Sequence, residues 1–258
     1  MKTNLKFTMI ILTVALSLSS CFNQVFEYGN GIITEETRTI PEFKSISSGG
    51  AYNIYFEYAD TPSVLVSCES NLIEYIETAV FDDELKIRTP NFVNIRPRKD
   101  IEVYVKGPYV EKIHLSGSGL IQTDSISSEN LTLSVSGSGK VEAAFYGSNL
   151  NINISGSGDI DLYAECDYNE IKISGSGKVY LSGYADRSYY SISGSGKFYG
   201  YDFPVNDSEV KISGSGDLYL NVAEQLTATI SGSGNIYYIG NPQITTNISG
   251  SGKLFDEN

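Results

Sequence analysis

The chain has 258 residues, of which 41% are hydrophobic, with 19 tyrosines, 25 glycines and no tryptophan. Its formal net charge of −13 at pH 7 repels phosphate backbones, so the composition argues against nucleic acid as a partner. The length is compatible with a single all-β solenoid domain.

Residues 1–20 have the layout of a secretory signal peptide. Two lysines precede an apolar run from Phe7 to Leu18, which is too short to span a bilayer. The run ends in Leu18-Ser19-Ser20-Cys21, which resembles the lipobox of bacterial lipoproteins, where the cysteine is acylated. We predict lipidation at Cys21 and an outer-membrane lipoprotein that faces the periplasm or the cell surface. An ordinary signal peptide with an incidental cysteine is the alternative.

Two segments lie between the signal peptide and the repeats. Residues 21–39 are polar and contain Gly and Asn, which predicts a tether between the membrane and the domain. Residues 40–110 are rich in strand patterns without a period, which predicts the irregular β-rich cap that a solenoid needs at its end. Within this cap, residues 46–50 are interpreted as a degenerate first copy of the repeat, and residues 71–78 as a short helical turn.

Residues 111–258 are organised by the tetrapeptide Ser-Gly-Ser-Gly. The eight copies are spaced by 18 to 20 residues, and such a period is typical of stacked repeats. A flexible Gly/Ser linker is the alternative, but linkers do not carry apolar residues at fixed offsets from every glycine. The copies begin at Ser116, Ser136, Ser155, Ser174, Ser193, Ser213, Ser231 and Ser249.

Apolar residues flank each copy at alternate positions, as Ile152, Ile154, Ile160 and Leu162 do around Ser155. A period of two predicts strands with one buried face. The glycines fall on the buried positions, where a missing side chain lets the backbone bend and approach its neighbour. We therefore predict an all-β fold, a parallel β-helix whose eight turns stack into a rod about 40 Å long.

Three further segments carry a family resemblance together with the repeats. Leu72-Ile73-Glu74, Leu85-Lys86-Ile87 and the sequence from Tyr238 to Pro242 resemble those of auto-transporter adhesins with a head GIN domain. The similarity covers roughly residues 40 to 255, and we assign residues 40–258 to a head GIN-like domain. The resemblance implies an exported bacterial protein, often a lipoprotein, built as a right-handed parallel β-helix. It brings no catalytic or binding residues with it.

The sequence holds few residues for catalysis. His114 is the single histidine, and the cysteines other than Cys21 are Cys68 and Cys166, both on buried positions. These residues cannot assemble a zinc site or a Cys/His nucleophile pair, and Ser-Gly-Ser-Gly lacks the lysine and helix of a phosphate loop. We predict no catalytic residues, no metal, no cofactor and no disulfide between Cys68 and Cys166.

Two outward rows run along the predicted stack. The position after the last glycine of each copy gives a row of mostly alternating charge. Two residues further, the row passes from Gln122, Glu142 and Asp161 to five aromatic residues. In register, these rings would form a stripe on the solvent side that could contact a glycan or a protein; the alternative is that the rings only stabilise one another. The stripe consists of Tyr180, Tyr199, Tyr219, Tyr237 and Phe255.

Hypotheses of different classes remain open at this point. The first is a lipid-anchored, non-catalytic binding, adhesion or scaffold module that contacts a glycan or a protein partner through the aromatic stripe. The second is a glycan-active enzyme, similar to a polysaccharide lyase or hydrolase, with Asp159, Asp161 and Glu142 as acids. A purely structural envelope protein is the third. The regular spacing favours the first, because we expect a cleavage site to interrupt the repeat with an irregular loop.

Overall fold

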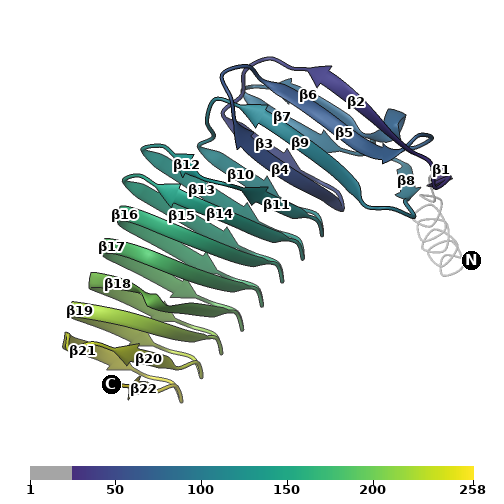
Figure 1. Ribbon diagram of the computed structural model, residues 1–258. Helices are drawn as coiled ribbons and strands as arrows, with labels where there is room; N and C mark the ends of the chain where they lie inside the picture. The colour runs from purple at the N-terminus through teal and green to yellow at the C-terminus, as the bar shows by residue number, and fades with distance from the viewer. Residues whose placement is uncertain (1–24) are drawn as a thin grey trace, which may run out of the picture.

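The computed structural model describes residues 25–258, so the predicted signal peptide and Cys21 lie outside the described residues. The described chain winds into stacked turns along one axis, with its two ends at opposite ends of the stack (Figure 1). The helical segment among these residues is the 3-10 turn η1 (Ile73–Tyr75), within the range predicted for a helical turn. No helix in this part of the chain is long and apolar enough to cross a membrane.

The repeat region forms a parallel stack in chain order. Neighbouring strands pair with an offset of one repeat, as Ile152 with Ile171 and Asp159 with Lys178. This arrangement confirms the predicted fold class, a parallel β-helix. The strands are β10 (Lys112–Leu115), β11 (Leu120–Thr123), β12 (Ile126–Ser127), β13 (Asn130–Val135), β14 (Lys140–Tyr146), β15 (Asn149–Ile154), β16 (Asp159–Ile173), β17 (Lys178–Ile192), β18 (Lys197–Ile212), β19 (Asp217–Ile230), β20 (Ile236–Ile239), β21 (Gln243–Ile248) and β22 (Leu254–Asp256).

The Ser-Gly-Ser-Gly copies form one corner of every turn, and their glycines lie in columns. A Cβ atom added to Gly175 would lie 1.9 Å from the carbonyl oxygen of Gly156, and one on Gly194 would lie 2.1 Å from that of Gly175. Backbone hydrogen bonds cross the corner, as from Ser176 N to Gly156 O at 3.0 Å. Only glycine allows successive corners to approach this closely, which explains why the tetrapeptide recurs unchanged.

The inward rows of apolar side chains fill the interior of the stack. Ile152, Val210 and Ile230 are fully buried, and burying a side chain of this size stabilises the fold by about 1.5 to 3 kcal/mol. Polar side chains interrupt these rows at a few positions. Asn169, Ser188 and Ser208 are buried in register with one another, and Ser48 and Thr123 are buried elsewhere in the stack. The stack is therefore held mainly, but not entirely, by apolar rows.

The N-terminal region is β-rich, as predicted, but its strands do not stack in chain order. β7 and β9 form the outermost parallel turn, and β3 and β4 lie between that turn and β10 and β11. Antiparallel strands then cover this end, with β2 on β5, β5 on β9 and β6 on β7. The strands are β1 (Val25–Tyr28), β2 (Ile33–Thr39), β3 (Ser45–Ser48), β4 (Tyr52–Tyr58), β5 (Ser63–Glu69), β6 (Glu77–Phe81), β7 (Glu84–Arg88), β8 (Val93–Arg96) and β9 (Ile101–Gly107).

The degenerate copy at residues 46–50 takes the place of a repeat corner. Ile46 pairs with Ile113, and a Cβ atom on Gly117 would lie 1.8 Å from the carbonyl oxygen of Gly50. The corner at residues 46–50 therefore stacks directly against the first complete Ser-Gly-Ser-Gly, which confirms the interpretation of these residues as a copy of the repeat.

The tether predicted for residues 21–39 is wrong from Val25 onward. β1 pairs with β8 and β2 pairs with β5, so these residues belong to the folded body. The buried carboxylate of Glu69 also accepts hydrogen bonds from the backbone N–H groups of Gly31 and Arg98. Burial of Glu69 acts in the opposite direction, but these backbone donors leave the pKa of the carboxyl lowered.

Candidate functional site

The five aromatic residues predicted to form a stripe lie in register on five successive turns, and we call them the aromatic ladder. Neighbouring ring centroids are 4.8 to 5.0 Å apart, and neighbouring ring planes are inclined by 6° to 11°. The rings come from β17, β18, β19, β20 and β22, and the strand registers place them directly above one another. The ladder consists of Tyr180, Tyr199, Tyr219, Tyr237 and Phe255.

The ring faces inside the ladder cover one another. Nearly parallel rings with centroids this close must be stacked with an offset, since rings lying side by side in one plane would overlap. The end rings are the exposed ones, with Tyr180 at 38% and Phe255 at 37% exposure. The middle of the ladder therefore presents ring edges and hydroxyl groups to a ligand, and free faces are available only at its ends.

The column of the ladder continues toward the N-terminal end through three polar positions and a second aromatic pair. Asp161, Glu142 and Gln122 follow Tyr180 in register. Tyr55 and Tyr104 come next, with ring centroids 5.1 Å apart and planes inclined by 23°. The sequence analysis missed this pair, because the strands that carry it belong to the region whose stacking order differs from chain order.

The acids named for the enzyme hypothesis are engaged with neighbouring groups. Lys140 Nζ lies 2.6 Å from Glu142 Oε1 and 3.6 Å from Asp161 Oδ2. The hydrogen bond to Glu142 raises the pKa of Lys140. Asp159 Oδ1 instead accepts the backbone N–H of Lys178 at 3.0 Å. Glu142 and Asp161 thus share one lysine, and Asp159 satisfies a backbone donor of the next turn.

Residues in the predicted row of alternating charge bind neighbouring turns both by an ion pair and by hydrogen bonds to backbone N–H groups. Lys197 and Asp217 form an ion pair across neighbouring turns at 2.9 Å. Asp217 Oδ1 accepts the backbone N–H of Asn235 at 3.1 Å, and Asn235 Oδ1 accepts that of Lys253 at 3.1 Å. Acid and amide side chains in this row therefore supply acceptors to the backbone N–H groups of Lys178, Asn235 and Lys253, each of which follows a glycine corner.

A groove of about 660 Å³ lies beside the ladder. β18 carries three more residues than β19 between the pairs Gly200–Leu220 and Pro204–Asn221, so residues 201–203 bulge out of the stack. The bulge is held by a hydrogen bond from Asn221 Nδ2 to the carbonyl oxygen of Tyr201 at 3.0 Å. The groove is lined by Asp161, Tyr180, Leu181, Ser182, Tyr199, Gly200, Tyr201, Asp202 and Tyr219.

Tyr201 and Asp202, in the bulge, are groove residues that sequence reasoning missed. Tyr201 packs against the ladder. Its ring stands at 87° to that of Tyr219, with centroids 5.7 Å apart. Its hydroxyl oxygen is buried without a hydrogen-bond partner among the described residues, and burial raises its pKa. Two signals in the sequence point to the bulge: the repeat intervals of 20 and then 18 residues on either side of Ser213, and Pro204 within a strand.

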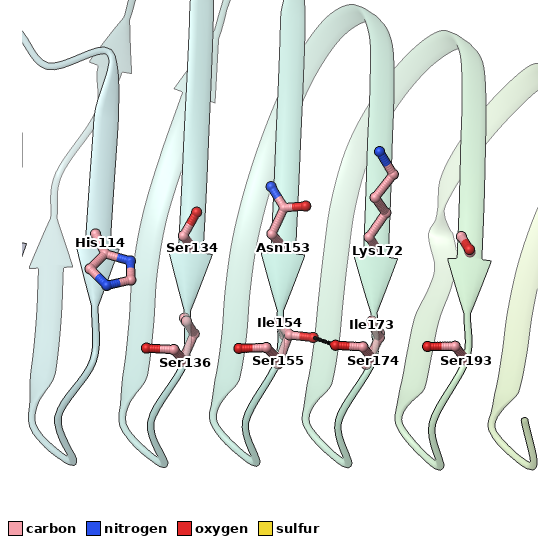
Figure 2. Close-up of a pocket in the computed structure, with 12 residues that line it drawn as sticks. His114, Ser134, Ser136, Asn153, Ile154, Ser155, Lys172, Ile173, Ser174 and Ser193 are labelled. Carbon is pink, nitrogen blue, oxygen red and sulfur yellow. Dashed lines mark hydrogen bonds between the residues drawn. The ribbon is translucent and has the colours of Figure 1, made fainter.

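A second, smaller groove of about 400 Å³ follows the glycine corner. Figure 2 shows His114, Ser134, Asn153 and Lys172 on successive turns, above a row of serine hydroxyls from the repeats. The Oγ atom of Ser174 donates to Ile154 O at 3.4 Å. The residues that line this groove include no carboxylate and no tyrosine, so it offers a ligand less varied chemistry than the groove beside the ladder.

The part of the chain that the structure describes contains no cluster of three or more His, Cys, Asp or Glu side chains that could hold a metal. Cys68 and Cys166 are buried free thiols. Burial raises the pKa of Cys68 to about 11 and that of Cys166 to about 12. Both thiols are therefore protonated at neutral pH and unsuited to act as nucleophiles.

Comparison with known proteins identifies a family and a fold. The family model described as "Putative auto-transporter adhesin, head GIN domain" matches residues 42–163 and 142–242. A solved structure from Parabacteroides distasonis, described as a putative lipid binding protein, is 26% identical with a TM-score of 0.85, covering 90% of this chain and 100% of that chain. A putative adhesin from Parabacteroides merdae is 24% identical with a TM-score of 0.86, covering 91% and 100%. No curated protein matches.

Proposed function

This chain belongs to the family of auto-transporter adhesins with a head GIN domain, and we propose that it is a non-catalytic binding module that holds a glycan in the groove beside the aromatic ladder. The observation that carries the proposal is the composition of this groove. It combines tyrosine rings and hydroxyls with the carboxylates of Asp161 and Asp202.

The chemistry of the groove suits a sugar. A sugar ring has apolar C–H faces and hydroxyl groups around its edge, so it is recognised by aromatic rings together with oxygen acceptors. The exposed face of Tyr180 at the end of the ladder and the ring of Tyr201 supply the apolar contacts. Asp161 and Asp202 accept hydrogen bonds from sugar hydroxyls.

The arrangement of the acids supports binding over catalysis. Glycosidases need two carboxyl groups that face one bond from opposite sides, with one of them free to give up a proton. Glu142 and Asp161 both contact Lys140, and Asp159 is bonded to backbone. The glycan-active enzyme stays the second hypothesis, and it predicts cleavage of the bound polysaccharide.

The family description suggests a surface or envelope protein. We further propose that Cys21 carries a lipid that anchors the chain in the bacterial outer membrane. Because β1 begins at Val25, four positions after Cys21, such an anchor would hold the N-terminal end of the solenoid close to the bilayer. The name of the P. distasonis relative makes lipid vesicles a second ligand to assay.

A glycan array and calorimetry with the purified protein test the proposal. We expect binding to a defined glycan, with affinity about two- to tenfold weaker in Tyr201→Ser, since losing one aromatic contact costs about 0.5 to 1.5 kcal/mol. Tyr184→Ser is the matched control, because Tyr184 lies on the same strand as Tyr180, is 53% exposed and does not line the groove. Equal weakening by both variants, binding to vesicles alone, or release of shorter sugars would contradict the proposal.

A further inference from the structure

The last turn of the stack leaves its core layer open. Ile244 and Ile248 are 41% and 42% exposed, whereas Leu226 and Ile230, which hold the same row one turn earlier, are fully buried. All six residues of β21 are exposed, and β19 is the strand with which β21 pairs among the described residues. The outer edge of β21 therefore presents unpaired backbone groups beside an uncovered apolar row.

The opposite end of the stack is protected. Antiparallel strands cover the first turn there, and the edge strand β2 carries Glu35, Glu36 and Arg38. Charged residues on an edge strand hinder its pairing with another chain. β21 contains no charged residue, whereas β22, the other strand of the last turn, ends at Asp256. The edge of β21 is therefore readier than the edge of β2 to accept a further strand.

The pattern of β21 is complementary to itself. Its inward row reads Ile244, Thr246, Ile248, which is the same sequence of apolar, polar and apolar residues in either direction. Antiparallel pairing of two copies about Thr246 would place each Ile244 opposite Ile248 of the partner subunit. The outward residues Thr245 and Asn247 would then face each other, so every directly opposed pair along the strand is uncharged.

We propose that the C-terminal turn binds the same turn of a second copy of this chain, with β21 antiparallel to β21, to form a tail-to-tail dimer. The interface uses the same patch on both copies and therefore closes at two subunits. Head-to-tail growth into a filament is prevented by the covered, charged N-terminal end. The pairing also covers Ile244 and Ile248, which removes apolar surface from water.

Sedimentation of the full-length protein in detergent tests the dimer. The wild-type protein is expected to sediment at twice the monomer mass and to dissociate on dilution. Thr246→Lys places two like charges at the centre of the interface, so it is expected to give the monomer mass. Thr37→Lys makes the same change at an exposed position of β2 and is expected to leave the dimer intact. A wild-type monomer at every concentration would overturn the proposal.

Cross-linking provides a second measurement that does not depend on weakening the interface. In the proposed pairing, Thr246 lies opposite the same residue of the second copy. Thr246→Cys is therefore expected to form a disulfide-linked dimer under mild oxidation, whereas Thr37→Cys is not. Equal cross-linking of the two variants would contradict the antiparallel pairing. Glycan binding is expected to be the same in Thr246→Lys and wild type, so failure of this proposal and failure of the proposed function are separable.

Discussion

The two sides of each turn obey different constraints. The glycine corner is identical in eight copies, whereas the far side absorbs the whole variation of the interval between 18 and 20 residues. At the corner, backbone contacts backbone, and a Cβ atom would lie about 2 Å from a carbonyl oxygen of the previous turn. On the far side, the chain accommodates the bulge at residues 201–203 and the positive φ angles of Gly183 and Gly240. The candidate groove therefore lies where the repeat can vary.

The largest effect is expected from a methyl group at the corner. Gly175→Ala would place a Cβ atom 1.9 Å from Gly156 O, so neighbouring turns must separate, at a cost of about 3 kcal/mol or more. Gly49→Ala is the matched control, because a Cβ atom there meets nothing closer than Ser116 Oγ at 3.7 Å. Urea unfolding of both variants measures the difference. Equal stability would show that the corner is not sterically constrained.

The next effect concerns the ladder beside the groove. Tyr199→Ser removes stacking against both Tyr180 and Tyr219, and each contact is worth about 0.5 to 1.5 kcal/mol. We expect the free energy of unfolding to fall by about 1 to 3 kcal/mol. Tyr58→Ser, at a tyrosine that is 65% exposed, is expected to change it by less than about 0.5 kcal/mol. A ladder variant as stable as its control would mean that the stacked rings contribute nothing to stability.

A substitution in the buried row opposite the glycine corner is expected to stabilise the fold. Both amide atoms of Asn169 are buried between Leu150 and Ser188 in the stack, and the polar group of the described chain that interacts with this amide is the buried hydroxyl of Tyr190. Asn169→Leu removes the cost of burying them and extends the apolar row of Leu150, so we expect a gain of about 1 kcal/mol. Thermal unfolding of Asn169→Leu measures this gain in stability. Leu150→Asn, which is expected to destabilise the fold strongly, is the variant for comparison. A loss of stability in Asn169→Leu would show that Asn169 makes bonds essential to the turn.

The smallest effect is expected at the charged row after the corner. Lys197 and Asp217 are partly exposed, so Lys197→Gln should cost only about 0.2 to 1 kcal/mol, and less in high salt. The hydrogen bond to Asp217 raises the pKa of Lys197 above its ordinary value, so the contribution is present at neutral pH and is lost only as the pH rises past the lysine pKa. Urea unfolding at low and high salt tests this. A salt-independent loss would assign the effect to packing.

The sequence allowed the stack to be predicted because its information is local and periodic. Alternating residues such as Ile152 and Ile154 define the buried face, and a repeat of fixed length places Tyr180 beside Tyr199. The N-terminal region could not be predicted in the same way. β2 pairs with β5, which lies three strands further along the chain, and no repeat in the sequence indicates this pairing. Polar composition therefore suggested a tether where the chain forms edge strands.

Within the candidate site, the ladder was predictable but the groove was not. The ladder follows from register alone, whereas the groove depends on the three extra residues between Gly200 and Pro204, which change the path of one strand. The orientation of the rings also lay beyond the sequence, because it follows from the spacing of the turns. The pair Tyr55 and Tyr104 joins the column only through the inverted order of the first two turns.

Because the repeats stack in chain order, the number of repeats determines the length of the solenoid. The two ends of the described chain, residues 25–258, lie at opposite ends of the stack (Figure 1). Duplication of one repeat would therefore lengthen the body by about 4.8 Å without disturbing the turns on either side. Each duplicated repeat could also add one ring to the aromatic ladder. Gene duplication can thus tune the length of such a protein while leaving its ends unchanged.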